Sequence, residues 1–330
     1  MLRAMDSAVA GLRSHQNKLD VIGNNISNVN TFGFKSQNYT FKDAMYQTAN
    51  GSSGGKAPTG TDASVAGGVG GTNAAQFGYG SMQGTITTDM TSSTPSYVGG
   101  FNAAINGSGF FITKSTADKI DQSGSTAQEN SDKLKAAAIS YTRVGQLSVD
   151  ANGFVVDANG NYVFGFQPET PNASVPNYDA NKNNLVALRA PHVEAEGGGD
   201  PTYSWDEPSQ LKSVSIDNDG TIKGVVDANG QAATVIIGKV AIASFQNQDG
   251  LLKAGNNTFT AAVGDNTGVA AATMPGGSTP TLLAGYLEAS NVDLAKEFSD
   301  MITTQRGFQA NTKMVTVSDQ ILEELVNMKR

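Results

Sequence analysis

Residues 291–328 read NVDLAKEFSDMITTQRGFQANTKMVTVSDQILEELVNM, and this stretch near the end of the chain decides the fold. Apolar residues occupy every seventh position, starting just before it: Leu287, Leu294, Met301, Phe308, Val315 and Leu322. A seven-residue repeat places these side chains in one narrow seam along a helix. We therefore predict a helix from Asn291 to Met328, about 57 Å long at 1.5 Å per residue.

The companion positions of this repeat and the two ends of the stretch refine the prediction. The companions are partly polar: Asn291, Phe298, Gln305, Thr312, Asp319 and Val326. Ser290 and Asp293 resemble a capping box with an acid at its third position, which predicts that the helix starts there. Lys329 and Arg330 suit the negative end of the helix dipole.

The start of the chain repeats the pattern and predicts a second helix over residues 2–28. Its seam consists of Met5, Leu12, Leu19 and Ile26, with Leu2 and Val9 at companion positions. Two seams at opposite ends of the chain, separated by a long region of different character, favour a two-helix coiled coil that brings the ends together.

Apolar residues outside the seams indicate what such a pair would do. Ile22, Val29, Ile321 and Leu325 would remain exposed on a two-helix hairpin. Burying this surplus against copies of the same chain, in contacts that do not close on themselves, gives a helical filament. Two ordinary amphipathic helices, each on its own domain, are the alternative. A membrane-surface helix is disfavoured because neither end has a basic face with aromatic anchors.

Between the helices the sequence is typical of short strands and tight turns. Three copies of Asp-Ala-Asn-Gly begin at Asp150, Asp157 and Asp227, and a relative, Asp-Asn-Asp-Gly, begins at Asp217. Such dipeptides supply the positive φ of hairpin turns. Strand-like runs flank them at 154–156, 162–166, 214–216, 221–226 and 234–243. We predict a β-meander or small barrel-like domain there.

The resulting fold is α+β, with long N- and C-terminal α-helices forming a coiled-coil-like inner domain and a mainly β central domain. Residues 1–30 and 287–330 would form the inner domain, and residues 31–85 an extended bridging segment. Residues 86–286 would form the β-rich outer domain, with a possible short helix around residues 133–138. Residues 169–208, rich in Pro, Asn and Gly, would be a small insertion in it.

Composition excludes several classes of protein. A formal net charge of −8 and a pI of about 4.8 argue against nucleic-acid binding, which needs a basic surface. The absence of cysteine excludes disulfides and thiolate sites. No segment has the roughly 18 apolar residues that span a bilayer. Asp6 and Arg13 interrupt any secretory signal core, so we expect export without a cleaved signal peptide.

No pattern of catalytic, cofactor-binding or metal-ligating residues emerges. The only histidines are His15, off the seam of the first helix, and His192, in a loop-like stretch; neither belongs to a zinc motif. Residues 217–220 indicate a turn rather than a calcium loop, because position twelve is Ala228. Residues 51–56 lack the spacing of a phosphate loop. We expect no catalytic residue, metal or cofactor.

Several of these stretches resemble one protein family. Residues 19–35 (LDVIGNNISNVNTFGFK) closely resemble the N-terminal signature of bacterial flagellar rod and hook proteins. Residues 290–298 (SNVDLAKEF) and 304–311 (TQRGFQAN) resemble the C-terminal signature. Residues 105–111 (INGSGFF) and 141–143 (YTR) are similar to central landmarks of the family. The resemblance touches the start, middle and end of the chain and implies a structural subunit, not an enzyme.

Within the family, residues 294–298 (LAKEF), 307–309 (GFQ) and 325–330 (LVNMKR) look more like hook than distal rod sequences. The resemblance then implies a subunit of the flagellar hook, a self-assembling, tubular and flexible universal joint that transmits torque from rod to filament. The short central region is closer to a rod subunit in size. A distal rod subunit, which forms a stiff shaft of the basal body, is therefore the alternative, and a secreted β-rich adhesin or enzyme is a more distant one.

The resemblance also implies partners and a location. The chain would form a helical homopolymer and contact the distal rod, hook cap and hook–filament junction proteins and the flagellar export apparatus, in the extracellular hook of a bacterial flagellum. We expect no nucleic acid and no direct membrane insertion. The expected assembly interface consists of apolar residues at both ends: Leu2, Met5, Val9, Leu12, Leu19, Ile22, Ile26, Val29, Leu287, Leu294, Phe298, Met301, Phe308, Val315, Leu322, Leu325 and Val326.

Overall fold

The computed structural model describes residues 2–55, 70–171, 176–178, 184–194, 202–205, 211–228, 231–277 and 279–328. The chain forms two compact units, each assembled from separate stretches. The first, which we call the helical unit, comprises Met1–Ser27, Gln37–Thr88 and Val292–Arg330. The second, the β unit, comprises Asn28–Ser36 and Asp89–Asn291. Terminal helices with a mainly β central region confirm the α+β class.

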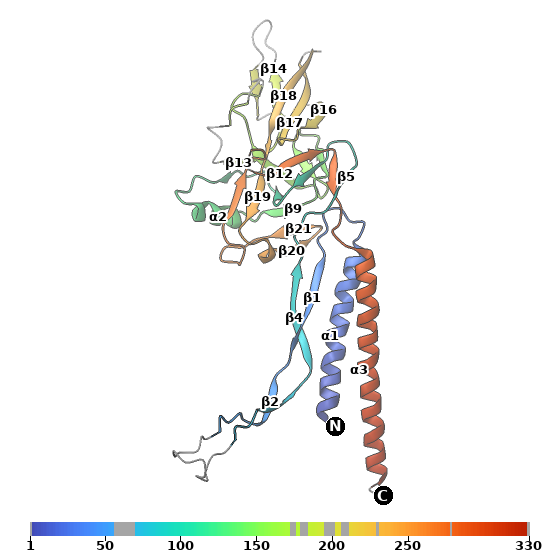
Figure 1. The fold of residues 1–330 in the computed structure, drawn as a ribbon. Coiled ribbons are helices and arrows are strands. Elements are labelled where there is room, and N and C mark those ends of the chain that lie inside the picture. Colours follow the sequence, from blue (N-terminus) through green and yellow to red (C-terminus); the bar gives the residue numbers. More distant parts are fainter. Residues whose placement is uncertain are drawn as a thin grey trace. The chain divides into compact units, whose positions relative to one another are not determined.

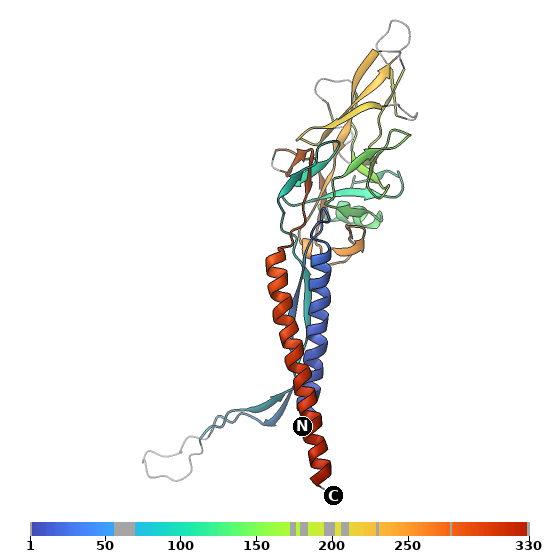
Figure 2. The same cartoon turned by 90° about the vertical axis from the view of Figure 1, so that its right-hand side faces the viewer.

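Two long helices dominate the helical unit, α1 (Leu2–Ser27) and α3 (Leu294–Met328), and they run side by side (Figures 1 and 2). The prediction of two long terminal helices is confirmed, although α3 begins three residues later than Asn291. Its first turn is capped by Asp293, whose Oδ1 accepts hydrogen bonds from the amides of Ala295 (2.9 Å) and Lys296 (3.3 Å). Ser290 is therefore not the capping residue, since it lies four residues before the helix.

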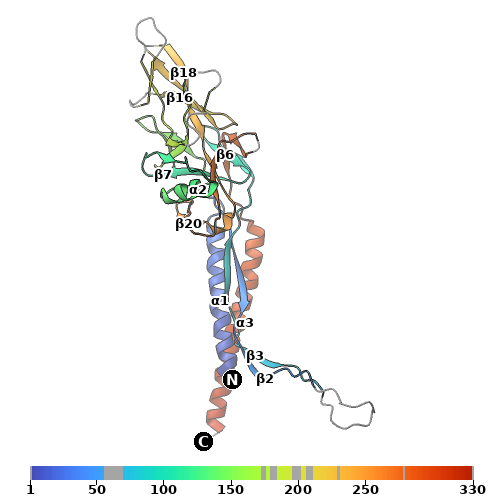
Figure 3. The same cartoon turned by 90° about the vertical axis from the view of Figure 1, so that its left-hand side faces the viewer.

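The rest of the helical unit is a β-ribbon made of two strand pairs. Strands β1 (Gln37–Asp43) and β4 (Ser81–Thr88) pair antiparallel and lie along α1. Ser14 on α1 donates a hydrogen bond to the carbonyl of Ser81 (3.2 Å). Farther along the ribbon, β2 (Tyr46–Asn50) pairs with β3 (Ala75–Gly78) and leads away from the helices (Figure 3). These strands belong to the helical unit, whereas the sequence predicted a separate bridging segment over 31–85.

The β unit is built around one large sheet of antiparallel strand pairs, in the order β16-β17-β18-β12-β7-β9-β21-β20, with further strands off this path. The strands are β5 (Pro95–Tyr97), β6 (Ala103–Asn106), β7 (Phe110–Lys114), β8 (Ile120–Asp121), β9 (Ser140–Thr142), β10 (Leu147–Val149), β11 (Val155–Asp157), β12 (Tyr162–Phe166), β13 (Asn184–Ala187), β14 (His192–Glu194), β15 (Thr202–Ser204), β16 (Leu211–Ile216), β17 (Thr221–Ala228), β18 (Gln231–Val240), β19 (Ile242–Phe245), β20 (Leu252–Gly255), β21 (Thr258–Thr260), β22 (Ala270–Thr273), β23 (Thr281–Ala284) and β24 (Tyr286–Glu288).

Among the described residues of the β unit are also two short helices, α2 (Ala127–Ala136) and a 3-10 turn at Gln248–Gly250. The α2 helix contains most of the stretch around 133–138 where a short helix was predicted. Its N-terminus is capped by Thr126, whose hydroxyl accepts from the amide of Glu129 (3.2 Å). Lys135 on α2 pairs with Asp265 at 3.0 Å, which ties the helix to the loop before β22.

The predicted hairpin turns lie where the Asp-Ala-Asn-Gly repeats occur. Asp150 turns the chain between β10 and β11, and Asp157 turns it between β11 and β12. In each turn the aspartate carboxylate accepts backbone amides of the residues two and four positions later. Gly153, Gly160 and Gly220 have φ near +80°, as hairpin glycines require. Of the third repeat, at 227–230, the last two residues lie outside the described part of the chain.

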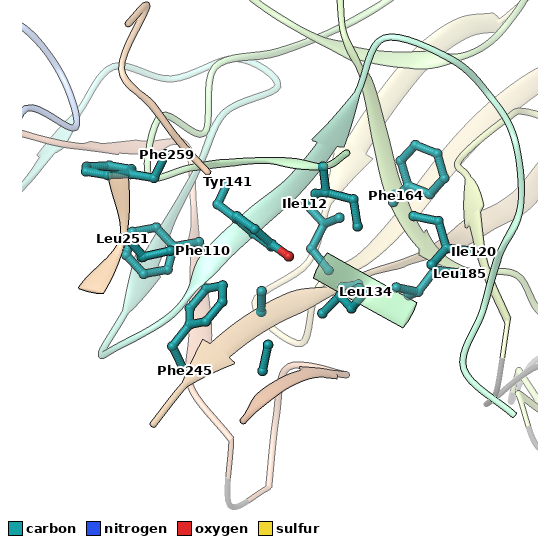
Figure 4. Close-up of a cluster of buried hydrophobic side chains, with 14 of the residues drawn as sticks. Phe110, Ile112, Ile120, Leu134, Tyr141, Phe164, Leu185, Phe245, Leu251 and Phe259 are labelled. Carbon is teal, nitrogen blue, oxygen red and sulfur yellow. The ribbon is translucent and has the colours of Figure 1, made fainter. Parts of the chain in front are cut away.

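The core of the β unit contains two clusters of buried side chains. One gathers Phe110, Tyr141, Phe164 and Phe245 with their apolar neighbours (Figure 4). The other includes Phe111, Val163 and Ile237, from strands that also contribute to the first cluster. Figure 4 shows the Tyr141 hydroxyl pointing into the first cluster. That hydroxyl has no hydrogen-bond partner among the described residues, and burial raises the pKa of Tyr141.

The predicted domain limits and the compact units differ in two places. Leu287, expected in the last helix, lies on β24 and is buried in the β unit. Residues 28–36, expected partly in the inner domain, belong to the β unit as well. Parts of the predicted insertion at 169–208 lie outside the described residues, and its described strands are β13, β14 and β15.

Candidate functional site

Small and polar residues contribute to the contact between α1 and α3 at several points along the two helices. A Cβ atom on Gly11 would lie 2.7 Å from Nδ2 of Asn311, and one on Gly307 would lie 2.7 Å from Cε1 of His15. Together with a contact between Asn25 and Glu297, these pairs show that the helices run antiparallel. The two backbones approach closely because glycine faces a larger side chain at each of these two crossings.

Asn25 joins three elements at the end of α1. Its Nδ2 donates to the carbonyl of Gln37 (2.8 Å) and to Oε1 of Glu297 (3.1 Å). Its Oδ1 accepts from the amide of Gln37 (3.0 Å). The side-chain amide thus pairs with the first residue of β1 as a neighbouring strand would, and at the same time holds α3. Asn25 is 1% exposed, so the loss of these bonds would leave buried polar groups without partners.

The α3 residues buried beside α1 form a different repeat from the predicted one. Met301, Phe308, Val315 and Leu322 are half-buried, as seam residues would be. Their partners are the positions four residues before each: Glu297, Thr304, Asn311 and Ser318, of which three are buried and Asn311 is half-buried. The predicted companions, Phe298 and every seventh residue after it, lie one position away and outside this contact. Coiled-coil packing of the predicted seam is therefore not confirmed.

The polar members of this face satisfy their own hydroxyls within the helix. Thr304 donates to the carbonyl of Asp300 (2.6 Å), and Ser318 donates to the carbonyl of Met314 (2.8 Å). A hydroxyl bonded to the preceding turn presents little unsatisfied polarity to the neighbouring helix. These residues can consequently be buried without a partner on α1.

Outside this contact, α3 exposes large apolar side chains to solvent in two groups. Near its start, Leu294, Phe298 and Ile302 follow one another at four-residue intervals. Nearer its end the exposed residues are Met314, Val317, Ile321, Leu325 and Met328, at helical spacing of three or four. Val326 beside them is 67% exposed. We call this set the α3 stripe. Exposed apolar side chains in such number on one helix are typical of surfaces that another protein covers.

The other predicted interface residues have varied positions. Met5, Leu12, Leu19 and Ile26 on α1 and Val29 in the β unit are half-buried, and Val9 is exposed. Ile22 is already buried inside the helical unit, at 4% exposed, instead of standing out from the helix pair. Leu2 lies on α1, but its side chain is outside the described residues.

The two histidines lie in different surroundings. His15 lies against Gly307 and also contacts the ring of Phe41 on β1, with centroids 5.2 Å apart. His192 is on β14, paired in register with Ser204. Within the described residues, no group of three or more His, Asp or Glu side chains is placed to hold a metal ion. Nor is any helix there long and apolar enough to cross a membrane.

Two titratable groups in the helix contact respond to pH in opposite directions. Burial, and secondarily the Lys18 ammonium, lower the pKa of His15 below its usual 6.5. The unfolded state then binds more protons, so this group removes stability as pH falls below 6.5. Burial, reinforced by Asp300 and opposed by the Asn25 hydrogen bond, raises the pKa of Glu297 above its usual 4.5. The folded state binds the extra proton there, so this group adds stability as pH falls toward 4.5.

We expect single substitutions to separate these two effects. In Glu297→Gln, the melting temperature of the helical unit, followed by helical ellipticity, should fall progressively as pH is reduced from about 7.5 to 5.5. Of these two groups, only His15 then still titrates. In His15→Gln the same acidification should leave the melting temperature unchanged or raise it. Parallel pH profiles for the two variants would show that neither group titrates in the helix contact.

Sequence reasoning missed the residues that shape this contact. Gly11, Asn25, Gly307 and Asn311 are small or polar, so a search for apolar periodicity passes over them. One signal was present in the sequence: glycines inside two stretches that otherwise read as continuous helix, where glycine costs roughly 1 kcal/mol relative to alanine. A glycine inside such a helix can mark a point where another element approaches closely.

Three protein-family descriptions match the chain. Residues 5–35 match the "Flagella basal body rod protein" family, and residues 283–328 match "Flagellar basal body rod FlgEFG protein C-terminal". Residues 133–224 match "Flagellar hook protein FlgE/F/G D1 domain". The first match covers most of α1, the second contains α3, and the third lies within the β unit.

Some individual relatives are named rod proteins and others are named hook proteins. The chain is 38% identical over 332 residues to the flagellar basal-body rod protein FlgG of Bacillus subtilis, covering 100% of both chains. It is 27% identical over 456 residues to the flagellar hook protein FlgE of Borreliella burgdorferi, again over 100% of both. With the flagellar hook protein FlgE of Escherichia coli it is 35% identical over 212 residues, which is 61% of this chain and 47% of that protein.

Proposed function

Because the chain belongs to the flagellar rod and hook protein family, a family of structural subunits and not of enzymes, we propose that it polymerises into the flagellar hook. The observation that carries this proposal is the α3 stripe. Its side chains are exposed in the single chain, and their burial would stabilise a polymer by roughly 25 cal/mol for each Å² of apolar surface covered. The helical unit is then the polymerisation domain.

The buried and the exposed residues of α3 make different contacts in this proposal. The face with Glu297, Thr304 and Ser318 is buried within the subunit, while the α3 stripe packs against neighbouring copies. Ile22 and Leu287, which are already buried in their own units, would support the interface from within. Contacts repeated head to tail without closure produce a helical tube. As a hook, that tube would transmit torque from the rod to the filament while it bends.

A distal rod subunit is the second candidate, and the similarity of the chain to a rod protein supports it. The 38% identity to a rod protein extends over the full length of both chains. The hook-like residues 294–298 and 307–309 favour the hook instead. Both candidates share self-assembly, flagellar neighbours and export through the flagellar apparatus, and they differ in the stiffness of the polymer.

Electron microscopy of polymer formed by the full chain tests the proposal. We expect tubes that are curved or that take several curvatures in one preparation. Straight, stiff tubes would replace the hook with the distal rod. A chain that remains monomeric at all concentrations and salt conditions would overturn self-assembly itself. A complementary test expresses the chain in bacteria that lack either their hook or their distal rod protein, where recovery of swimming in only the hook-less strain is expected.

A further inference from the structure

The chain passes between its two units at several places. At three of them, the adjoining residues of the β unit lie together. The chain passes between the units after Ser27, Ser36, Thr88 and Asn291. The Asp89 amide donates to the Ser36 carbonyl (2.8 Å), and the Ser36 amide donates to Oδ1 of Asn291 (2.7 Å). Nδ2 of Asn291 completes the ring by donating to the Asp89 carbonyl (2.9 Å). Each of the three connections is thus bonded to the other two.

A buried ion pair lies immediately behind this ring. Nζ of Lys35 is 2.8 Å from Oε1 of Glu288, and both side chains are at most 2% exposed. Lys35 also donates to the carbonyl of Thr91 (2.6 Å). Glu288 Oε1 accepts the amide of Ser93 (3.0 Å), and the Glu288 carbonyl accepts the amide of Gly33 (2.8 Å). The pair therefore bonds the same three segments that the ring joins.

Arg143 is the third member of the cluster and reaches it from the centre of the chain. Its Nε is 2.9 Å from Oε2 of Glu288, and its Nη2 donates a hydrogen bond to Oε1 of the same carboxylate (3.5 Å). Its Nη1 donates to the carbonyl of Gly109 and its Nη2 to that of Gly107, both at 2.8 Å. Arg143 follows β9 directly, so it couples the cluster to the large sheet.

The charges of this cluster are unequal, which makes its one carboxylate critical. Lys35 and Arg143 carry two positive charges, and Glu288 alone carries a negative one. Burial is the main influence on Lys35 and lowers its pKa, while Glu288 raises it. Removal of the Glu288 carboxylate would leave two buried cations hydrogen-bonded to backbone carbonyls and a hydroxyl, and offset in charge only by the weaker attraction of Asp89 for Lys35, a destabilising arrangement.

The cluster also brings together stretches that the sequence showed only as separate landmarks. Lys35 ends the N-terminal motif, Arg143 ends the central Tyr-Thr-Arg motif, and Asn291 stands in the C-terminal motif. Gly107 and Gly109 belong to the central motif at residues 105–111, and both have positive φ. Their conformation turns two carbonyls toward the Arg143 guanidinium.

We propose that Lys35, Arg143, Glu288 and Asn291 form a single clamp that holds the three connecting segments to the β unit as one cooperative group. The segments at 33–36, 89–93 and 286–291 then loosen together or not at all. If the chain works in a flagellar axial polymer, as proposed above, the clamp distributes load among all three connections instead of straining one. That consequence rests on the proposed function, whereas the cooperativity does not.

Hydrogen–deuterium exchange of the full-length monomer tests the cooperativity. In Glu288→Gln, peptides covering residues 28–36 and 89–93 should exchange roughly tenfold faster or more, as the loss of a hydrogen bond to a charged group implies. These segments lie far from position 288 in sequence. Asp217→Asn is the matched control, because it makes the same kind of change in an exposed pair with Lys223 and should leave both peptides unchanged. Unchanged exchange in Glu288→Gln would overturn the clamp.

Two more variants cover the case in which Glu288→Gln folds poorly. Asn291→Ala breaks only the ring and should speed exchange in all three segments while the core strands stay protected. In the double variant Lys35→Met with Glu288→Gln, the three segments should exchange no faster than in Glu288→Gln alone. Both substitutions remove the same interaction, the Lys35–Glu288 ion pair. Loosening confined to the 286–291 peptide in Asn291→Ala, or fully additive effects in the double variant, would show independent connections. All these readouts use the monomer, so failure of polymerisation would not affect them.

Discussion

Phe298→Asp is expected to remain monomeric at concentrations where the parent chain forms tubes. Phe298 is half-exposed in the single chain, so the substitution should barely alter the fold of the subunit. In the proposed polymer the α3 stripe would be covered, and an aspartate there would be buried without an evident partner. Burial of such a charge costs several kcal/mol per subunit. Because every subunit repeats the defect, sedimentation and electron microscopy should detect no tubes.

Gln305→Glu is the control for this prediction. It also adds a negative charge to α3, but at an exposed polar position outside the α3 stripe. We expect its tubes to form at a concentration close to that of the parent chain. Circular dichroism should show the same helix content in parent, control and variant. Tubes of normal appearance from Phe298→Asp would remove the α3 stripe from the assembly interface.

The long helices could be predicted from the sequence because their signal is local and repeated. Met301, Phe308, Val315 and Leu322 recur every seven residues, and this period indicates one helix whatever lies opposite. The predicted and observed ends of both helices differ by no more than three residues. The start of α3 was misplaced because Ser290 and Asp293 are both good capping residues, and only the backbone geometry shows which of them caps.

The partner face of α3 could not be predicted, because its packing depends on close approach rather than on hydrophobicity. Glu297, Thr304 and Ser318 are polar, and a search for apolar residues assigns such positions to solvent. Thr304 and Ser318 are tolerated there through hydroxyl bonds to their own helix, and Glu297 through Asn25. Asn25 and Glu297 are 272 residues apart in the sequence. No local pattern indicates that they meet.

The ribbon and the clamp were missed for a related reason. Strand β1 leaves most of its residues exposed, so it lacks the alternation that marks a half-buried strand. Lys35, Arg143 and Glu288 are separated by more than a hundred residues each, and single charged residues carry no sign of burial. The family resemblance marked four of the stretches involved, but only the structure brings them to one point.

Gly307→Leu is expected to separate α1 from α3 and to prevent assembly. Substitution of glycine inside a helix normally adds about 1 kcal/mol of helix stability. At this position the new Cβ would lie 2.7 Å from Cε1 and 2.8 Å from Nε2 of His15. His15 has little room to withdraw, because its ring lies against Phe41, which in turn contacts the buried Tyr39. Overpacking of this kind costs about 1–3 kcal/mol, and leucine adds three more carbons.

Gly23→Ala is the matched control for that variant, since a Cβ on Gly23 would meet nothing within 4 Å. It should raise the stability of the helical unit by about 0.5–1 kcal/mol, measured by helical ellipticity during urea unfolding. Gly307→Leu should instead lower that stability, and His15→Ala in the same chain should restore most of the loss, because it makes room for leucine. An equal gain from both glycine substitutions, with no effect of His15→Ala, would show that α1 and α3 do not pack closely at this crossing. The helix pair would then have to be held by the ribbon and by Asn25 rather than by contact between the two helices.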